Sequence, residues 1–113
     1  PIFIQIVERI EMDIISGKYK PGDKLPSVRD FAAEAAVNPN TMQKAFTELE
    51  RTGLVFSQRT TGRFITEDTS MIDELKSTLA KDKITELLSF MQQLGFQENE
   101  ILAMIGQTMK GEK

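Results

Sequence analysis

The sequence predicts a mainly α-helical protein with a small β-hairpin wing, arranged as a winged helix-turn-helix followed by a two-helix C-terminal tail. Apolar residues recur at helical spacing in several stretches, and a short basic hairpin pattern follows the third of them. No strand pattern occurs in the last third of the chain. We therefore expect two parts, a winged helix-turn-helix domain over residues 1–67 and a helical tail over residues 68–113.

The composition excludes several classes of function. The 113 residues contain no Cys and no His, which removes thiol chemistry, disulfides and the commonest transition-metal ligand. Acidic residues are scattered and no glycine-rich phosphate loop is present, so we expect no enzyme, no cofactor and no metal site. No apolar run approaches the roughly 20 residues of a membrane span, and no signal peptide is visible. A cytoplasmic protein without a membrane partner is therefore expected.

The charge is distributed unevenly along the chain. The formal net charge is −3 overall, but residues 1–66 carry +1 and residues 67–113 carry −4. Residues 38–66 alone carry +2. This asymmetry is compatible with a nucleic-acid face on the first half and an acidic appendage after it.

The first predicted helix covers Ile2 to Ser16, where apolar residues alternate with acidic ones at helical spacing. Gly17 supplies a residue that can end it, and we interpret this helix as core scaffold. The segment that follows contains Pro21 and Gly22, a pair that suits the two central positions of a type II turn.

A second helix is predicted to begin at Ser27, because Pro26 keeps the residue before it extended. Ser27 and Asp30 have the spacing of a variant capping box. Arg29 lies in the first turn, where the helix dipole slightly disfavours a cation. Contact with a phosphate or a base would explain this cation, and a solvated arginine is the alternative.

The third predicted helix extends from the N-cap Asn38 to Gly53, and the short turn before it makes the pair of helices typical of a helix-turn-helix. One face is an apolar stripe made of Met42, Ala45, Phe46 and Leu49. The opposite face begins with hydrogen-bonding side chains, namely Asn38, Asn40, Thr41, Gln43 and Lys44. Such side chains at a helix N-terminus suit base edges and phosphates in the DNA major groove. An ordinary polar surface helix is the alternative for this helix taken alone.

Two short strands, Leu54–Arg59 and Arg63–Thr66, are predicted around a tip that contains Gly62. Arg59 and Arg63 flank this tip. A basic hairpin that follows a recognition helix is a wing, which can lay cations along the DNA backbone or into the minor groove. A hairpin that only covers the core is the alternative.

Over about residues 1–66 the sequence resembles the winged helix of the GntR family of bacterial transcription regulators. The resemblance rests on the opening segment 1–6, on PGDKLPSVR at 21–29, on NPNTMQKA at 38–45 and on LERTGLV at 49–55. The segment at 38–45 is similar to the YtrA-like branch in particular.

In that family the second-helix arginine, the start of the third helix and the wing tip contact DNA. The matching positions here are Arg29, Asn38, Asn40, Thr41, Gln43, Lys44, Gly62 and Arg63. Arg59 joins these DNA-binding candidates through its place at the hairpin tip. Pro39 and Gln43 stand where many relatives carry arginines, which implies that other bases are read. Thr60 and Thr61 precede Gly62 where many relatives have a Gly-x-Gly tip.

Residues 69–111 carry helical spacing that slips after residues 81–83, which predicts one long helix with an irregularity or two shorter helices. Thr69 or Ser70 can cap the start. Gly95 ends this pattern, and Phe96 is placed for the apolar contact of a Schellman ending. A last helix is predicted to open at Glu98.

The tail helices present apolar faces that they cannot bury alone. A two-fold contact with the same tail of a second chain is the simplest solution, and the YtrA-like resemblance implies it, since that branch has a short helical dimerisation tail. Packing back onto the winged helix is the alternative. The expected dimerisation residues are Ile72, Leu75, Leu79, Ile84, Leu87, Leu88, Met91, Leu94, Ile101 and Ile105.

We therefore expect a sequence-specific, DNA-binding transcriptional regulator, a repressor that binds a pseudo-palindromic operator in double-stranded DNA as a homodimer. The family context implies target genes for a neighbouring membrane transporter. A small-molecule effector is possible, but the sequence identifies none. The alternative is a winged helix that binds proteins and not DNA. That alternative predicts aromatic anchors on the third helix's polar face, where the sequence has none.

Overall fold

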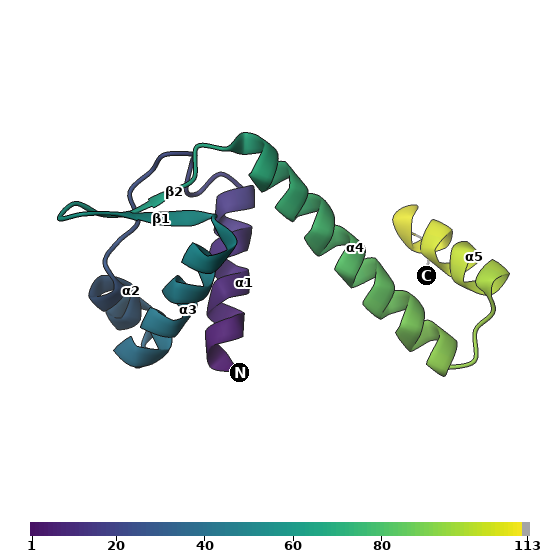
Figure 1. Cartoon of the computed structure of the whole chain (residues 1–113). Coiled ribbons are helices and arrows are strands. Elements are labelled where there is room, and N and C mark those ends of the chain that lie inside the picture. The colour runs from purple at the N-terminus through teal and green to yellow at the C-terminus, as the bar shows by residue number, and fades with distance from the viewer. Residues whose placement is uncertain (112–113) are drawn as a thin grey trace. The chain divides into compact units, whose positions relative to one another are not determined.

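The computed structural model describes residues 1–111, which form five α-helices and one two-stranded antiparallel sheet (Figure 1). The elements in chain order are α1 (Ile2–Ile15), α2 (Val28–Ala35), α3 (Pro39–Thr52), β1 (Val55–Gln58), β2 (Gly62–Ile65), α4 (Thr69–Gln93) and α5 (Glu98–Met109). The mainly helical fold with a hairpin wing is as predicted. The chain divides into two compact units, Pro1–Lys76 and Ser77–Lys113, and the division falls within α4.

The core of the first unit lies around α3, against which α1, α2 and β1 pack. The predicted apolar stripe of Met42, Ala45, Phe46 and Leu49 is fully buried. The other buried apolar residues are Val7, Ile10, Ile14, Leu25, Ala32, Leu54, Val55 and Ile65. Because one face of α3 is entirely committed to this core, its opposite face points outward.

The predicted helix boundaries rest on caps that the structure contains. The Ser27 hydroxyl accepts a hydrogen bond from the Asp30 N–H (3.1 Å), which fixes the start of α2. The Asn38 side-chain oxygen accepts one from the Asn40 N–H (2.7 Å) at the start of α3. Gly53, with φ of 87°, ends α3. The turn between α2 and α3 also contains a residue that the sequence did not single out, Ala36, in the left-handed conformation (φ 55°).

The wing is stabilised by a segment that precedes it in the chain. The Leu25 N–H donates to the Arg63 carbonyl (2.8 Å), and the Ile65 N–H donates to the Asp23 carbonyl (2.8 Å). Lys24 and Phe64 form the bridge between these two bonds. The stretch after the Pro-Gly turn therefore adds a third extended strand segment to β2. Since an isolated two-stranded hairpin is marginally stable, this pairing is what holds the base of the wing in place.

Helix α4 is one continuous helix of 25 residues, which settles the choice between one helix and two. Its cap differs from the prediction, which named Thr69 or Ser70. The Asp68 carboxylate accepts hydrogen bonds from the N–H groups of Ser70 (3.1 Å) and Met71 (3.3 Å). A carboxylate stabilises the positive end of a helix more than a hydroxyl does, and hydrogen bonds from Ser70 and Met71 lower the pKa of Asp68.

The second unit is the rest of α4 with α5. Gly95 (φ 96°) ends α4, and the Phe96 N–H donates to the Met91 carbonyl (3.1 Å), which is the Schellman ending that the sequence predicts. Met91 and Ile101 are the apolar side chains buried among the described residues of this unit.

None of the helices in residues 1–111 is long and apolar enough to cross a membrane.

Candidate nucleic-acid interface

The N-terminal half of α3 carries the predicted DNA-binding residues on its outward face. Asn40, Gln43 and Lys44 are exposed, and Thr41 is half-buried. The buried stripe on the other side sets this orientation, so the polar side chains are brought together at one end of one helix. Amide, hydroxyl and ammonium groups in this arrangement can bond both base edges and phosphates.

Asn38 has a structural role that limits what it can offer to DNA. Its side-chain oxygen caps the helix by accepting a hydrogen bond from the Asn40 N–H. The Asn38 amide group remains exposed at the same end of α3 and is a hydrogen-bond donor. Asn38 can therefore donate to a phosphate or base acceptor without releasing its cap.

Gln43 has a neighbour that the sequence analysis missed. The Thr47 hydroxyl donates to the Gln43 carbonyl (2.9 Å) and lies 3.5 Å from the Gln43 side-chain nitrogen. Both side chains are exposed, so Thr47 extends the polar face by one helical turn. The i, i+4 spacing from Gln43 was the signal that could have identified it.

Lys44 is held against the start of α1. Its ammonium nitrogen lies 4.3 Å from the centroid of the Phe3 ring, a cation–π distance. A shallow pocket of about 410 Å³ lies here between the two helix starts. It is lined by Ile2, Phe3, Asn40, Thr41 and Lys44. The aromatic ring thus limits the positions of the lysine beside the amides of α3.

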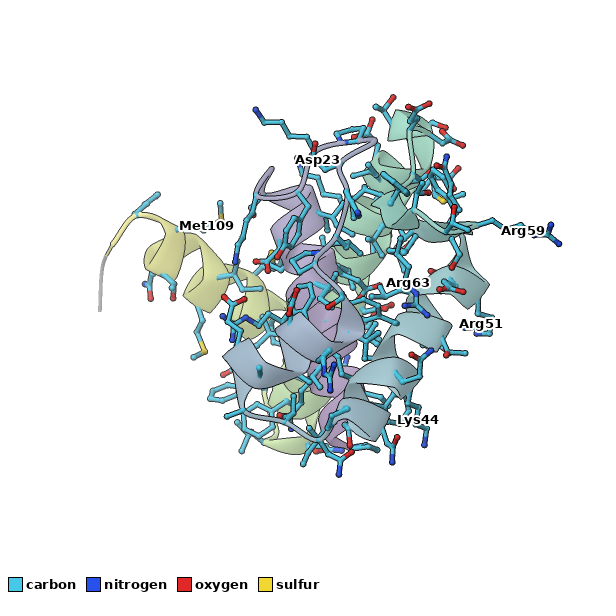
Figure 2. The ribbon with its side chains drawn as sticks, turned by 90° about the vertical axis from the view of Figure 1, so that its left-hand side faces the viewer. Asp23, Lys44, Arg51, Arg59, Arg63 and Met109 are labelled. Carbon is cyan, nitrogen blue, oxygen red and sulfur yellow. The ribbon has the colours of Figure 1, made fainter. Side chains whose placement is uncertain are left out.

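Arg29 and the wing tip supply further cations. Arg29 is exposed in the first turn of α2. Figure 2 shows the Arg59 side chain pointing away from the hairpin. The tip turns at Thr60, which has φ of 66°. Gly62 also has positive φ (116°), and a Cβ there would approach the Lys24 side chain to 3.1 Å.

A groove of about 680 Å³ lies between the wing and the start of α2. It is lined by Tyr19, Lys24, Leu25, Pro26, Ser27, Val28, Asp30, Thr60, Thr61, Gly62 and Arg63. Lys24 is a cation in this groove that the sequence analysis assigned only to a turn. Lys24 pairs with Phe64 of β2, and a pairing between residues so far apart in sequence could not be predicted from a local pattern.

Arg63 occupies a different environment from the one that the sequence predicts. The sequence predicts a DNA-binding cation beside the tip, but the Arg63 side chain is only 24% exposed and forms an ion pair with Glu50 of α3. The Ser57 hydroxyl donates to the same Glu50 oxygen (2.9 Å). Burial raises the pKa of Glu50, but the hydrogen bonds from Arg63 and Ser57 outweigh it and lower that pKa below its ordinary value.

Arg51 is paired as well, but within α3 and in solvent. Its guanidinium lies 2.5 Å from Glu48, and the Arg51 side chain is 70% exposed. Figure 2 shows Lys44, Arg51 and Arg59 along one side of the first unit.

Within residues 1–111, no group of acidic side chains is placed to hold a metal ion.

The predicted dimerisation residues lie in three kinds of environment. Ile72 and Leu75 are half-buried against the core of the first unit, while Met91 and Ile101 are buried inside the second unit. The half-buried members in the second unit are Leu79, Leu88 and Ile105. The exposed members are Ile84, Leu87 and Leu94. Four further apolar residues of this unit are exposed although they are not among the predicted dimerisation residues, namely Phe90, Leu102, Met104 and Met109.

An open apolar groove of about 430 Å³ lies in the second unit between the end of α4 and α5. It is lined by Leu87, Phe90, Met91, Leu94, Phe96, Met104, Ile105, Thr108 and Met109. The Thr108 hydroxyl donates its hydrogen bond to the Met104 carbonyl (2.8 Å). The groove therefore offers an apolar surface on a unit whose own buried core is very small.

Comparison with known proteins gives one consistent result. A family model described as bacterial regulatory proteins, gntR family, matches residues 4–65. The HTH-type transcriptional regulator YhcF of Bacillus subtilis (strain 168) is 40% identical over 102 residues, which are 90% of this chain and 84% of that protein. The HTH-type transcriptional repressor YtrA of the same organism is 40% identical over 94 residues, or 83% and 68%.

Two solved structures extend the comparison. A GntR family transcriptional regulator from Listeria monocytogenes is 40% identical, with a TM-score of 0.88 over 95% of this chain and 94% of that chain. The AraR DNA-binding domain in complex with operator ORX1 is 30% identical, with a TM-score of 0.56 over 58% of this chain and 80% of that chain. The part shared with the operator complex is thus about the size of the first unit.

Proposed function

Because the chain belongs to the GntR family of bacterial regulatory proteins and is a DNA-binding regulator rather than an enzyme, we propose that it represses transcription by occupying an operator as a homodimer. The observation that carries the proposal is the division of α3 into a fully buried apolar stripe and an outward face that is polar at its N-terminal end. A helix of this kind can enter the major groove without loss of core packing.

The proposed contacts follow from the chemistry of each group. The amides of Asn40 and Gln43 read base edges, where an Asn or Gln amide can form a bidentate pair with adenine. Thr41 and Lys44 bind the phosphate backbone beside them, and Arg29 binds a phosphate or a base from the start of α2.

The wing contributes at a second place on the DNA. Arg59 extends from its tip and binds the backbone or enters the minor groove. Gly62 begins β2 just after the tip with a positive φ that other residues rarely adopt, and it leaves room for the Lys24 side chain. The similarity of the first unit to a protein solved with its operator supports this arrangement.

Repression requires no chemistry beyond occupancy, which suits a chain without a metal or cofactor motif. The relative named a repressor, YtrA, matches 83% of this chain. Two-fold pairing through the exposed apolar residues of the second unit would present two copies of α3 to one duplex. The half-site centres would then lie about 34–36 Å apart or a multiple of this. In line with the family context, we propose that the regulated genes encode a neighbouring membrane transporter.

The test is selection of binding sites from a random duplex pool at near-physiological salt, since affinity for DNA depends strongly on ionic strength. Enrichment of an inverted repeat is the expected result. A variant with Asn40 and Gln43 both changed to Ala is the control, and it should retain its fold but lose the enriched motif. No enrichment by folded, dimeric protein would contradict the proposal and favour a protein partner instead.

A further inference from the structure

Glu50 joins α3 to both strands of the wing. One of its carboxylate oxygens accepts hydrogen bonds from the Arg63 guanidinium of β2 and from the Ser57 hydroxyl of β1 (2.9 Å). Ser57 and Arg63 are directly opposite each other in the strand register. Three residues that are separated in sequence thus meet at one oxygen, and we name them the α3–wing latch (Glu50, Ser57 and Arg63).

A second contact holds Arg63 to the same helix. Its guanidinium carbon lies 5.2 Å from the centroid of the Phe46 ring, which belongs to the fully buried stripe of α3. The side chains of Arg63 and Glu50 are 24% and 32% exposed. Both charges are therefore partly withdrawn from water, where a charge-assisted hydrogen bond is stronger than at an open surface.

We propose that Glu50 and Arg63 are positioning residues, which hold the wing at a fixed place relative to α3, and that Arg63 does not itself bind DNA. This inference rests on the proposed function of the first unit. It assigns to Arg63 a role different from the contact that the family resemblance implies, because its guanidinium already has a carboxylate partner and an aromatic face.

The physical reason lies in the geometry of two-point binding. Helix α3 and the wing tip contact the duplex at separate places, so any freedom of the wing must be lost on binding and weakens affinity. The base of the wing is fixed by its pairing with residues 23–25, but the tip extends beyond that pairing. The latch joins the middle of the hairpin to α3 and so restricts the motion of the wing in the free protein.

The test is a double-mutant cycle on operator affinity with Glu50→Gln, Arg63→Gln and the double variant. Each single change should weaken binding about tenfold, and the double variant should also lose about tenfold rather than hundredfold. The reversed pair, Glu50→Arg with Arg63→Glu, should recover most of the affinity. That recovery is not expected of an arginine that acts on phosphate.

The matched control is Glu48→Gln, which makes the same charge change on the same helix but breaks a pair that does not reach the wing. It should leave affinity unchanged or slightly improved, because it removes a negative charge near DNA. The salt dependence separates the alternatives. Loss of a phosphate contact reduces the slope of log affinity against log salt by about 1, whereas Arg63→Gln should leave this slope unchanged.

A reduced slope for Arg63→Gln, or tighter binding by Glu50→Gln, would show that Arg63 binds DNA and would overturn the inference. A readout without DNA keeps the two proposals apart. Backbone NMR order parameters at residues 59–61 should fall in Glu50→Gln and not in Glu48→Gln. If the wild type binds no operator, the proposed function fails, while this comparison still decides whether the latch holds the wing.

Discussion

Gln43 combines an exposed side chain with a hydrogen-bonding neighbour, Thr47, one helical turn away. Its amide lies on the outward face of α3 beside Thr47, and neither side chain contributes to the core. Arg29 is equally exposed at the start of α2. These residues can therefore be changed with little effect on folding, which makes them clean probes of DNA contact.

Gln43→Ala should weaken operator binding by about 1–3 kcal/mol, the usual cost of one lost base contact, and Arg29→Ala should weaken it as well. The melting temperature and the oligomeric state should not change measurably. Fluorescence anisotropy with labelled operator gives the affinity, and Gln92→Ala on α4 is the matched control. A folding defect in either variant would contradict the contact assignment.

Ala36 is the residue at which backbone strain can be tested. It adopts a left-handed conformation (φ 55°) that glycine enters at little cost but that costs other residues about 1 kcal/mol or more. Ala36→Gly should therefore stabilise the protein by roughly 0.5–1 kcal/mol. Ala33→Gly, in the exposed interior of α2, should destabilise it by a similar amount. Urea unfolding of both variants compares them directly.

The helix caps were predictable from the sequence, because each depends on residues close to it in the chain. Ser27, Asn38, Gly53 and Gly95 act within four residues of their own position. The latch was not predictable, because Glu50 and Arg63 are 13 positions apart and meet only when the wing folds against α3. The pairing of residues 23–25 with β2 was missed for the same reason, since no local pattern marks a partner 40 positions away.

Helix α1 contains a buried carboxyl group, whose burial disfavours the charged form. Glu11 is only 9% exposed. Burial, followed by the charges of Glu8 and Glu48, raises its pKa above 4.5. A carboxyl whose pKa is raised by folding binds more protons in the native state, so stability falls as pH rises from the unfolded-state pKa through the folded-state pKa.

Glu11→Gln should therefore raise the melting temperature at pH 7, and this gain should disappear below about pH 4, where the wild-type carboxyl is protonated in both states. Thermal melts followed by circular dichroism between pH 3.5 and pH 8 test this. Glu74→Gln, at an exposed position of α4, should show no such gain. A gain of equal size at both ends of the pH range would point to packing rather than charge.

The second unit buries few of its apolar side chains, and most of them are exposed. Its core consists of Met91 and Ile101, while Leu87, Phe90 and Leu94 remain exposed on the end of α4. Sequence periodicity predicted that these helices have apolar faces, but it could not separate the residues facing α5 from those facing outward. That separation depends on how α5 folds back after Gly95.

Leu87→Glu or Leu88→Glu should dissociate the proposed homodimer, because a charge within its proposed apolar interface would lose its hydration. Operator affinity should fall by about 100-fold or more, since each half-site would then bind a separate molecule without the benefit of linkage. Light scattering gives the mass, and Ser89→Glu introduces the same charge at a neighbouring exposed position as the control. A Leu87→Glu protein that stays dimeric would remove these residues from the interface.

The groove between the wing and α2 contains Tyr19, whose ring lies 6.2 Å from that of Phe31. It is the single tyrosine of a chain that has no tryptophan. Tyrosine emission therefore originates from the first unit, whereas far-ultraviolet circular dichroism averages over every helix. The two signals, recorded on one unlabelled sample, compare the unfolding of the DNA-facing unit with that of the entire chain. Coincident transitions would mean that both units unfold as one cooperative structure.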